Sequence, residues 1–287
     1  MRTVPALIVA LIAVVLLAAC HPEPDLGVIP YEQKLVIDGA IEDKGFARIF
    51  LSYSASYFQP IDSANIIDLV VGTAKVTVSN GTTSEILTLR RDNNYFPPYI
   101  YESTEIRGEV GKTYTLTVDL KGQRYTASTT IPPPARFDKL WFEDTPDKDS
   151  LGYLYGSIAD DPNTANYYRI FTERVHTDTK YIPIYLSTVG DQYFNGQTFT
   201  FSMLRGPESF TNIDDDLYFQ KGDTVMVKLC TMDKAHFDFW RTLERELYVA
   251  GNPFASSGNE IMSNIDGKKA LGVWGGYGVS YYRTVYR

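Results

Sequence analysis

Cysteine is scarce in this chain. Its 287 residues contain two cysteines, Cys20 and Cys230, and no C-x-x-C pair. So few thiols exclude a disulfide framework, and zinc-type sites need clustered Cys and His residues that are missing here. We therefore expect no bound metal and no cofactor.

Histidine and the common catalytic motifs are also rare. The three histidines are His21, His176 and His236, and no G-x-S-x-G or H-E-x-x-H motif occurs. A Ser or Cys nucleophile needs a base beside it, whereas a glycosidase needs only two carboxylates placed together in space. The prediction is that the protein is not an enzyme, with a surface hydrolase kept as the least favoured hypothesis.

Positive charge is in short supply. Lys and Arg total 27 against 35 Asp and Glu, which gives a formal net charge of −8. Because an acidic surface repels phosphate backbones, nucleic acid is not an expected partner. Hydrophobic residues make up 44% of the chain, and its 21 Tyr and 15 Phe favour pleated sheets. We expect a mainly β protein of one large domain or two smaller ones.

No hydrophobic run is long enough to span a membrane. The apolar stretch at residues 4–17 follows Arg2 and ends on small residues before Cys20. It is typical of a secretory signal peptide, predicted here over residues 1–19. Residues 17–20 (LAAC) resemble a bacterial lipobox, and this resemblance implies a lipid on Cys20. Residues 20–31 follow as a polar, proline-containing tether.

Alternating strands dominate the first half. Residues 74–79 alternate apolar with polar side chains and run into Asn80-Gly81, while residues 113–120 do the same before Lys121-Gly122. Both dipeptides are hairpin turn signals. Strands are also expected at 34–41 and 47–53. This spacing predicts an N-terminal immunoglobulin-like or transthyretin-like β-sandwich over residues 32–132.

Three prolines at 132–134 interrupt the pattern. They suggest a boundary before a second β-rich domain at 135–287, the alternative being one continuous fold. Its expected strands are 153–158, 167–175, 181–187, 198–203 and 224–230.

One helix is expected, at about 232–249, with Thr231 as its cap. One apolar stripe along it falls at i, i+4, i+7 and i+11 and consists of His236, Trp240, Leu243 and Leu247.

Several candidate sites favour a structural interpretation. The glycine-rich residues 272–278 lack the following helix that a phosphate loop needs, so a glycine-kinked strand is expected. Residues 214–216 are three aspartates without calcium-loop spacing, which favours a solvated turn. Cys230 ends a strand and is expected to be a buried structural thiol.

An aromatic loop is the candidate contact surface. Tyr95, Tyr99 and Tyr101 lie in the proline-containing stretch at residues 93–102. Such loops can stack on sugars or dock peptides, the alternative being that the loop packs on its own domain.

The ordered set of short motifs along the chain resembles a family of Bacteroidota outer-membrane lipoproteins known as domain of unknown function 4249. The matching stretches after the lipobox are KLVIDGAI (34–41), GTAKVTV (72–78), GEVGKTYTLTV (108–118), TIPPP (130–134), NYYRIF (166–171), NPF (252–254), SNI (263–265) and LGVWGGY (271–277). Two departures, at 256–257 and at Trp274, read as packing changes.

This resemblance implies a role in nutrient uptake, because members of the family are often encoded beside TonB-dependent transporters. We expect a lipid-anchored outer-membrane protein that binds such a transporter or its cargo. The alternative is a stand-alone adhesin that binds glycans or peptides. Whether it sits on the surface or the periplasmic face is left open by the sequence.

Overall fold

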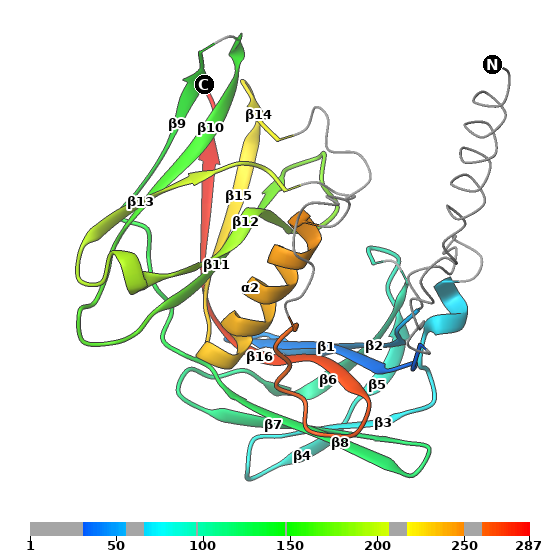
Figure 1. The fold of residues 1–287 in the computed structure, drawn as a ribbon. Helices are drawn as coiled ribbons and strands as arrows, with labels where there is room; N and C mark the ends of the chain where they lie inside the picture. Colours follow the sequence, from blue (N-terminus) through cyan, green and yellow to red (C-terminus); the bar gives the residue numbers. More distant parts are fainter. Residues whose placement is uncertain (1–30, 56–65, 96, 147, 207–216, 250–259) are drawn as a thin grey trace, which may run out of the picture. The chain divides into compact units, whose positions relative to one another are not determined.

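A computed structural model describes residues 31–55, 66–95, 97–146, 148–206, 217–249 and 260–287 (Figure 1). Residues Gln33–Arg287 form one compact unit, and every helix and strand below belongs to it. Cys20, the predicted signal peptide and the tether up to residue 30 lie outside the described residues. Across the part that is described, no helix is both long and apolar enough to cross a membrane.

The largest sheet has eight strands in the order β12-β11-β15-β16-β1-β2-β6-β5. Strands β1 and β16, from opposite ends of the unit, pair in parallel at its centre, and the other neighbours are antiparallel. The bounds are β1 Leu35–Glu42, β2 Phe46–Tyr53, β5 Thr88–Arg91, β6 Tyr99–Arg107, β11 Tyr167–Arg174, β12 Ile182–Gly190, β15 Thr224–Thr231 and β16 Ala270–Val285.

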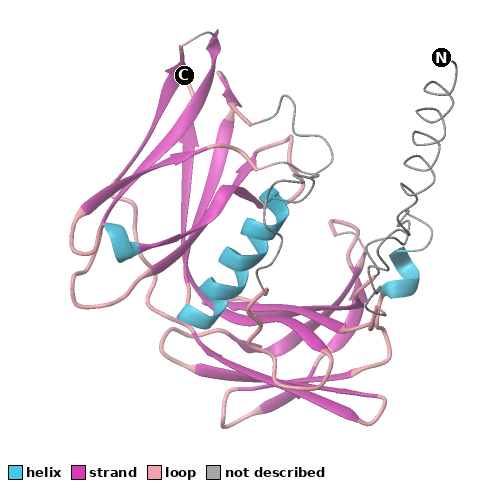
Figure 2. Ribbon diagram, viewed as in Figure 1, coloured by secondary structure: helices cyan, strands magenta, loops and turns pink. Residues whose placement is uncertain are grey.

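Two four-stranded sheets cover different parts of one face of the large sheet (Figures 1 and 2). The first has the order β4-β3-β7-β8, with β3 Lys75–Ser79, β4 Ser84–Ile86, β7 Thr113–Leu120 and β8 Gln123–Thr130. The second has the order β13-β10-β14 with β9 paired to β10, and consists of β9 Lys139–Thr145, β10 Lys148–Ala159, β13 Thr198–Met203 and β14 Phe219–Gln220. Two 3-10 turns complete the described elements, η1 Ile66–Leu69 and η2 Asp191–Tyr193.

The predicted N-terminal sandwich is present, since β1 and β2 pack their apolar face on β3, β7 and β8. The hairpin of β7 and β8 turns at Lys121 (φ 49°) and Gly122 (φ 76°), as the dipeptide predicted. Trp274 of β16 lies fully buried in this core, and its Nε1 donates a hydrogen bond of 2.9 Å to the Tyr114 carbonyl. The C-terminal strand therefore completes the N-terminal sandwich.

The boundary predicted at residues 132–135 does not separate two compact units. The large sheet contains strands from both sides of it, and Gln33–Arg287 form one unit. Ile131 is fully buried, and the Pro133 carbonyl accepts a 2.7 Å hydrogen bond from Thr231 Oγ1. The sequence pattern missed this because the pairing of β1 with β16 joins segments far apart in the chain.

The expected helix is α2, Lys234–Val249, and it lies on the opposite face of the large sheet (Figure 2). Its cap is Asp233 and not Thr231: the Asp233 carboxylate accepts a 2.9 Å bond from the His236 backbone N–H. Thr231 instead donates to backbone carbonyls. The helix contacts β12, β11 and β16, so it covers the sheet from its β12 edge to its centre.

Candidate ligand-binding pocket

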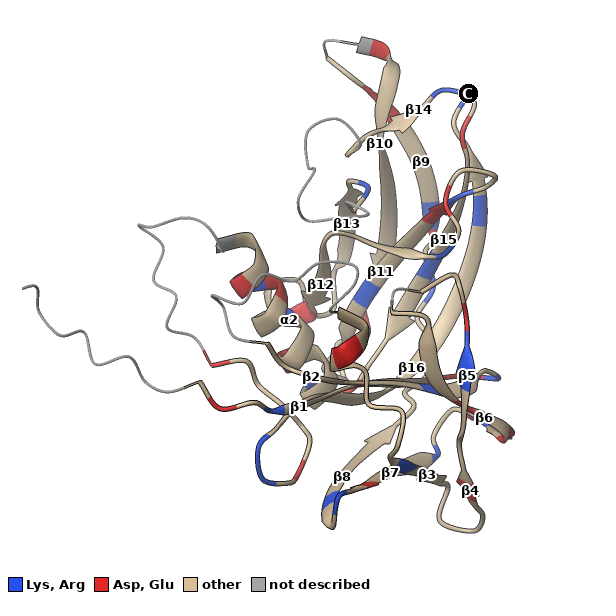
Figure 3. Ribbon diagram, turned by 90° about the vertical axis from the view of Figure 1, so that its right-hand side faces the viewer, with Lys and Arg blue, Asp and Glu red and all other residues tan. Residues whose placement is uncertain are grey.

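The face of the large sheet beneath α2 carries charged side chains beside a small apolar cluster that includes Phe171, Cys230 and Tyr277, whereas the other face is apolar. Along β1, Leu35, Ile37 and Ile41 enter the sandwich core, while Asp38 and Glu42 point the opposite way. This is the period-two alternation of a strand, so the two carboxylates share one face. Figure 3 shows acidic positions along α2 and basic positions on β11 and β15. Three of these charged residues, Asp38, Arg169 and Glu244, line one cavity between the helix and the sheet.

A cavity of about 560 Å³ lies between α2, β12 and this face of the sheet. That volume falls within the range of small-molecule sites. The helix contributes Trp240, Leu243 and Leu247, which are the outer part of the apolar stripe seen in the sequence. The other lining residues are Asp38, Arg169, Thr179, Lys180, Tyr181, Ile182, Pro183, Ile184, Glu244 and Tyr248.

Arg169 lies in the cavity wall and is 5% exposed. Its Nε donates to Ser187 Oγ (3.2 Å), its Nη1 donates to the Tyr277 hydroxyl (3.1 Å), and its guanidinium lies 3.5 Å from the Trp240 ring centroid. Among the described residues no carboxylate forms an ion pair with it. A buried cation without an ion pair is costly, which marks this arginine as a candidate for ligand contact.

Asp38 lines the same cavity. Its carboxylate makes no hydrogen bond or ion pair with any residue in the described ranges. The residue is exposed, so water reaches the carboxylate through the cavity. Burial raises the pKa of Asp38, and the nearby Arg169 opposes that rise. The cavity therefore holds an acid and a base, Asp38 and Arg169, that the protein has not paired with each other, and Lys180 is a further cation of the lining.

Glu42 lies four residues further along β1 on the same face and provides the contrast. It accepts 2.8 Å and 2.9 Å bonds from Lys228 Nζ and the Tyr281 hydroxyl. Burial alone would raise its pKa, but Lys228 and Tyr281 outweigh burial and lower it. On this face, the Glu42 carboxylate has an ion-pair partner and the Asp38 carboxylate has none among the described residues.

The close packing of α2 on the sheet requires a glycine at position 275. A Cβ at this position would overlap the imidazole of His236, which lies 4.4 Å from the Tyr277 ring. Burial first, and Arg169 second, lower the pKa of His236 to about 3. His236 is therefore a neutral packing residue at physiological pH.

A larger cavity, about 1030 Å³, lies along α2 and the start of β16. Its lining includes Glu260 and Ile261, next to residues 250–259, which are outside the described residues. We favour the smaller cavity as the site because it holds the unpaired Asp38 and Arg169.

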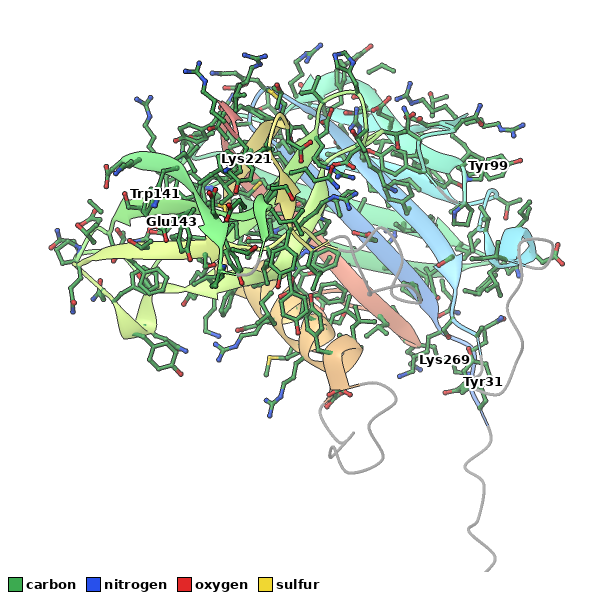
Figure 4. The ribbon with its side chains drawn as sticks, turned by 90° about the horizontal axis from the view of Figure 1, so that it is seen from above. Tyr31, Tyr99, Trp141, Glu143, Lys221 and Lys269 are labelled. Carbon is green, nitrogen blue, oxygen red and sulfur yellow. The ribbon has the colours of Figure 1, made fainter. Side chains whose placement is uncertain are left out.

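The three predicted contact tyrosines separate in the structure. Tyr101 is 3% exposed, and its hydroxyl bonds to Val71 and Ala74 of its own sandwich, so it is a core residue. Tyr99 is half-buried at the start of β6 (Figure 4). Tyr95 packs on Phe50 with ring centroids 5.0 Å apart, and its ring lies 5.3 Å from Lys180 Nζ. Because Lys180 lines the cavity, Tyr95 alone of the three adjoins the pocket.

The other candidates of the sequence are structural where they are described. Residues 272–278 lie inside β16, as the glycine-kinked strand predicted. Cys230 is fully buried, and burial raises the pKa of its thiol to about 12. Residues 214–216 lie outside the described residues. No group of three potential metal ligands is found among the side chains that the structure does describe.

A second surface carries aromatic side chains on the outer face of β9 and β10. Trp141 and Tyr155 stack with centroids 5.5 Å apart and planes at 16°, and Tyr153 meets Tyr218 edge-on at 5.3 Å. Trp141 Nε1 donates 2.8 Å to the Glu143 carboxylate, and both residues are labelled in Figure 4. All four rings are half-buried.

Sequence reasoning missed Asp38 and Arg169. Each is a charged residue inside a mostly apolar stretch, KLVIDGAI or NYYRIF, and such a charge is a sequence signal for a polar contact. What the sequence could not supply is that the two strands bring both side chains to one cavity.

Comparison with known proteins places the chain as follows. The family model described as "Domain of unknown function (DUF4249)" matches residues 23–283. No curated protein matches the chain at significance. One similar solved structure is the crystal structure of bovine butyrophilin, at 7% identity over 71% of this chain and 93% of that one. Its TM-score of 0.18 carries no argument about fold or function.

Proposed function

The chain belongs to the DUF4249 family, and from that premise we propose that it is a lipid-anchored outer-membrane protein that binds ligands for a TonB-dependent nutrient transporter. The lipobox at residues 17–20 supports the anchor, and the family resemblance supports the transporter. In this proposal the protein is not an enzyme, and its role is to recognise and bind the ligand.

One observation carries the binding role. The pocket beside α2 presents Asp38 and Arg169 without pairing them, beneath an apolar wall that includes Trp240. A mostly apolar concavity with a few convergent polar groups is the usual form of a small-molecule site. An accessory of an uptake system needs such a site to hold cargo.

Anchor and partner are tested together. Native membranes are extracted in mild detergent, and the protein is purified through an affinity tag at its C-terminus. We expect a barrel protein to co-purify. Cys20→Ser should move the protein out of the membrane fraction and remove its fatty-acid label. The matched control is Cys230→Ala, since Cys230 is buried and carries no lipid in this proposal.

Two outcomes would contradict the proposal. If Cys20→Ser stays membrane-bound to the same extent as the wild type, the anchor is wrong. If the protein purifies alone from several detergents, the transporter partnership is wrong.

A stand-alone glycan-binding adhesin is the second candidate, favoured by the aromatic row of Trp141, Tyr153, Tyr155 and Tyr218. Aromatic faces flanked by polar groups offer stacking surfaces for ligands. Under this alternative, Trp141→Ala would abolish retention on immobilised polysaccharide, while Asp38→Asn would leave it unchanged. Retention that is absent in the wild type would remove this candidate.

A further inference from the structure

We propose that the pocket beside α2 binds a zwitterion with an apolar side chain, namely an apolar amino acid or a short apolar peptide. The ammonium group is bound by Asp38 and the carboxylate by Arg169. This inference deepens the proposed function and rests on it for the biological role of the ligand.

Arg169 is prepared as a carboxylate receptor. Its Nε and Nη1 are fixed by Ser187 and Tyr277, and Trp240 covers its planar face. Its Nη2 makes no hydrogen bond with the described residues. A guanidinium held in one orientation with free N–H groups is well suited to a carboxylate.

Asp38 is the remaining free acceptor for an ammonium group. The other carboxylate of the wall, Glu244, is already engaged by the Ser187 hydroxyl and by the Thr188 backbone N–H. Asp38 has no such partner, although it lines the same cavity. Its exposed carboxylate is therefore accessible to a cation that enters the cavity.

Charge complementarity selects the class of ligand. A ligand with only an anion would meet Arg169 but would also face the repulsion of Asp38. A ligand with only a cation would meet Asp38 and face the repulsion of Arg169. A neutral sugar would leave both charges unpaired and would displace the water that solvates Asp38, at a cost. A zwitterion leaves neither charge unpaired.

The rest of the wall favours an apolar side chain. Trp240, Leu243, Leu247 and Ile184 line it, together with the tyrosines Tyr181 and Tyr248. A volume of about 560 Å³ has room for more than a single side chain, so a short peptide and an amino acid share the same recognition chemistry.

The experiment is isothermal titration of the full-length protein in detergent. The probes are L-leucine and L-leucyl-L-leucine, with N-acetyl-L-leucine, L-leucinamide and maltose as comparators. We expect at least one zwitterion to bind, and each blocked analogue to bind at least tenfold more weakly. Comparing the two zwitterions separates an amino-acid pocket from a peptide pocket.

Two variants test the assigned roles. Asp38→Asn should weaken the zwitterion at least tenfold but leave N-acetyl-L-leucine bound as well as before or better, a reversal of preference that general damage to the pocket would not produce. Arg169→Met should weaken every carboxylate ligand. If Arg169→Met fails to fold, the Asp38→Asn preference decides alone. Asp119→Asn is the control, because that carboxylate pairs with Arg124 on β7 and β8, away from the pocket.

The inference is overturned if neither zwitterion binds at millimolar concentration, if blocked analogues bind equally well, or if maltose is the ligand that binds. None of these outcomes changes whether a barrel protein co-purifies, so a failed ligand assignment is distinct from a failed transporter partnership.

Discussion

Two carboxylates in different parts of the molecule show how the same chemical group is used in opposite ways. Glu85, in the sandwich, accepts hydrogen bonds from the backbone N–H groups of Thr104, Glu105 and Ile106 and from the Thr104 hydroxyl. Asp38, in the pocket beside α2, accepts none from the described residues. Burial would raise the pKa of Glu85, but its hydrogen bonds outweigh burial and lower it, whereas the pKa of Asp38 is raised.

The difference separates a structural acid from a binding acid. Glu85 satisfies backbone donors near the end of β6, so its charge stabilises the fold. Asp38 has no hydrogen-bond or ion-pair partner among the described residues. This costs stability and leaves its charge free to contact a ligand. Residues that a fold leaves uncompensated are where ligand contact is expected.

The largest expected effect comes from removing the structural acid. Glu85→Ala should lower the free energy of unfolding by about 2 kcal/mol, because it leaves one buried and two partly buried N–H donors without their acceptor. Urea unfolding followed by circular dichroism measures this. Glu105→Ala is the control, since its side chain is exposed on the same strand, and it should change stability by less than about 0.5 kcal/mol. Equal losses in the two variants would show that Glu85 has no special role.

Low pH should destabilise the protein by weakening the packing of α2 on the large sheet. The pKa of His236 is about 3 in the folded chain, below its ordinary value of 6.5. The resulting stability is present above pH 6.5 and is lost as pH falls toward 3, by roughly 3 kcal/mol between pH 7 and pH 4.

Unfolding curves at several pH values measure that slope. Replacing the histidine by a residue that does not titrate, His236→Gln, should flatten it. His176→Gln should keep it, since His176 is exposed. A slope that survives His236→Gln unchanged would assign the acid sensitivity to other groups.

The contribution of Asp38 to the stability should be smaller than that of His236, and its pH dependence should have the opposite sign. The raised pKa of Asp38 means that its contribution to stability is present at low pH and is lost as pH rises through that pKa. At pH 7 the charged form is therefore a cost, and Asp38→Asn should stabilise the protein by less than about 1 kcal/mol, because water in the cavity screens the charge. A melting temperature below that of the wild type would mean that Asp38 has a structural partner.

No effect at all is expected at Cys230 under native conditions. Its pKa near 12 and full burial keep it a protonated, inaccessible thiol. In the Cys20→Ser protein, a thiol reagent should label nothing until urea unfolds the chain. Rapid labelling of the native protein would contradict the buried position of the thiol.

Local features were readable from the sequence because neighbouring residues cause them. Lys121-Gly122 gave the hairpin of β7 and β8, since the turn needs positive φ at adjacent positions. The apolar stripe predicted α2 and the face that it turns toward the sheet; it consists of His236, Trp240, Leu243 and Leu247. The scarcity of Cys and His set the expectation of no metal. The lipid on Cys20 and the transporter stay predictions of the sequence.

Only the tertiary structure decided how distant segments combine. The parallel pairing of β1 with β16 joined the two predicted domains and buried Trp274 in the N-terminal sandwich. Packing within that sandwich made Tyr101 a core residue. The pairing of β1 with β16 also brought Asp38 of β1 and Arg169 of β11 to one cavity under α2. The alternation within a strand says which residues share a face, but which strands become neighbours depends on non-local pairing and packing, and these leave no mark on a short stretch of sequence.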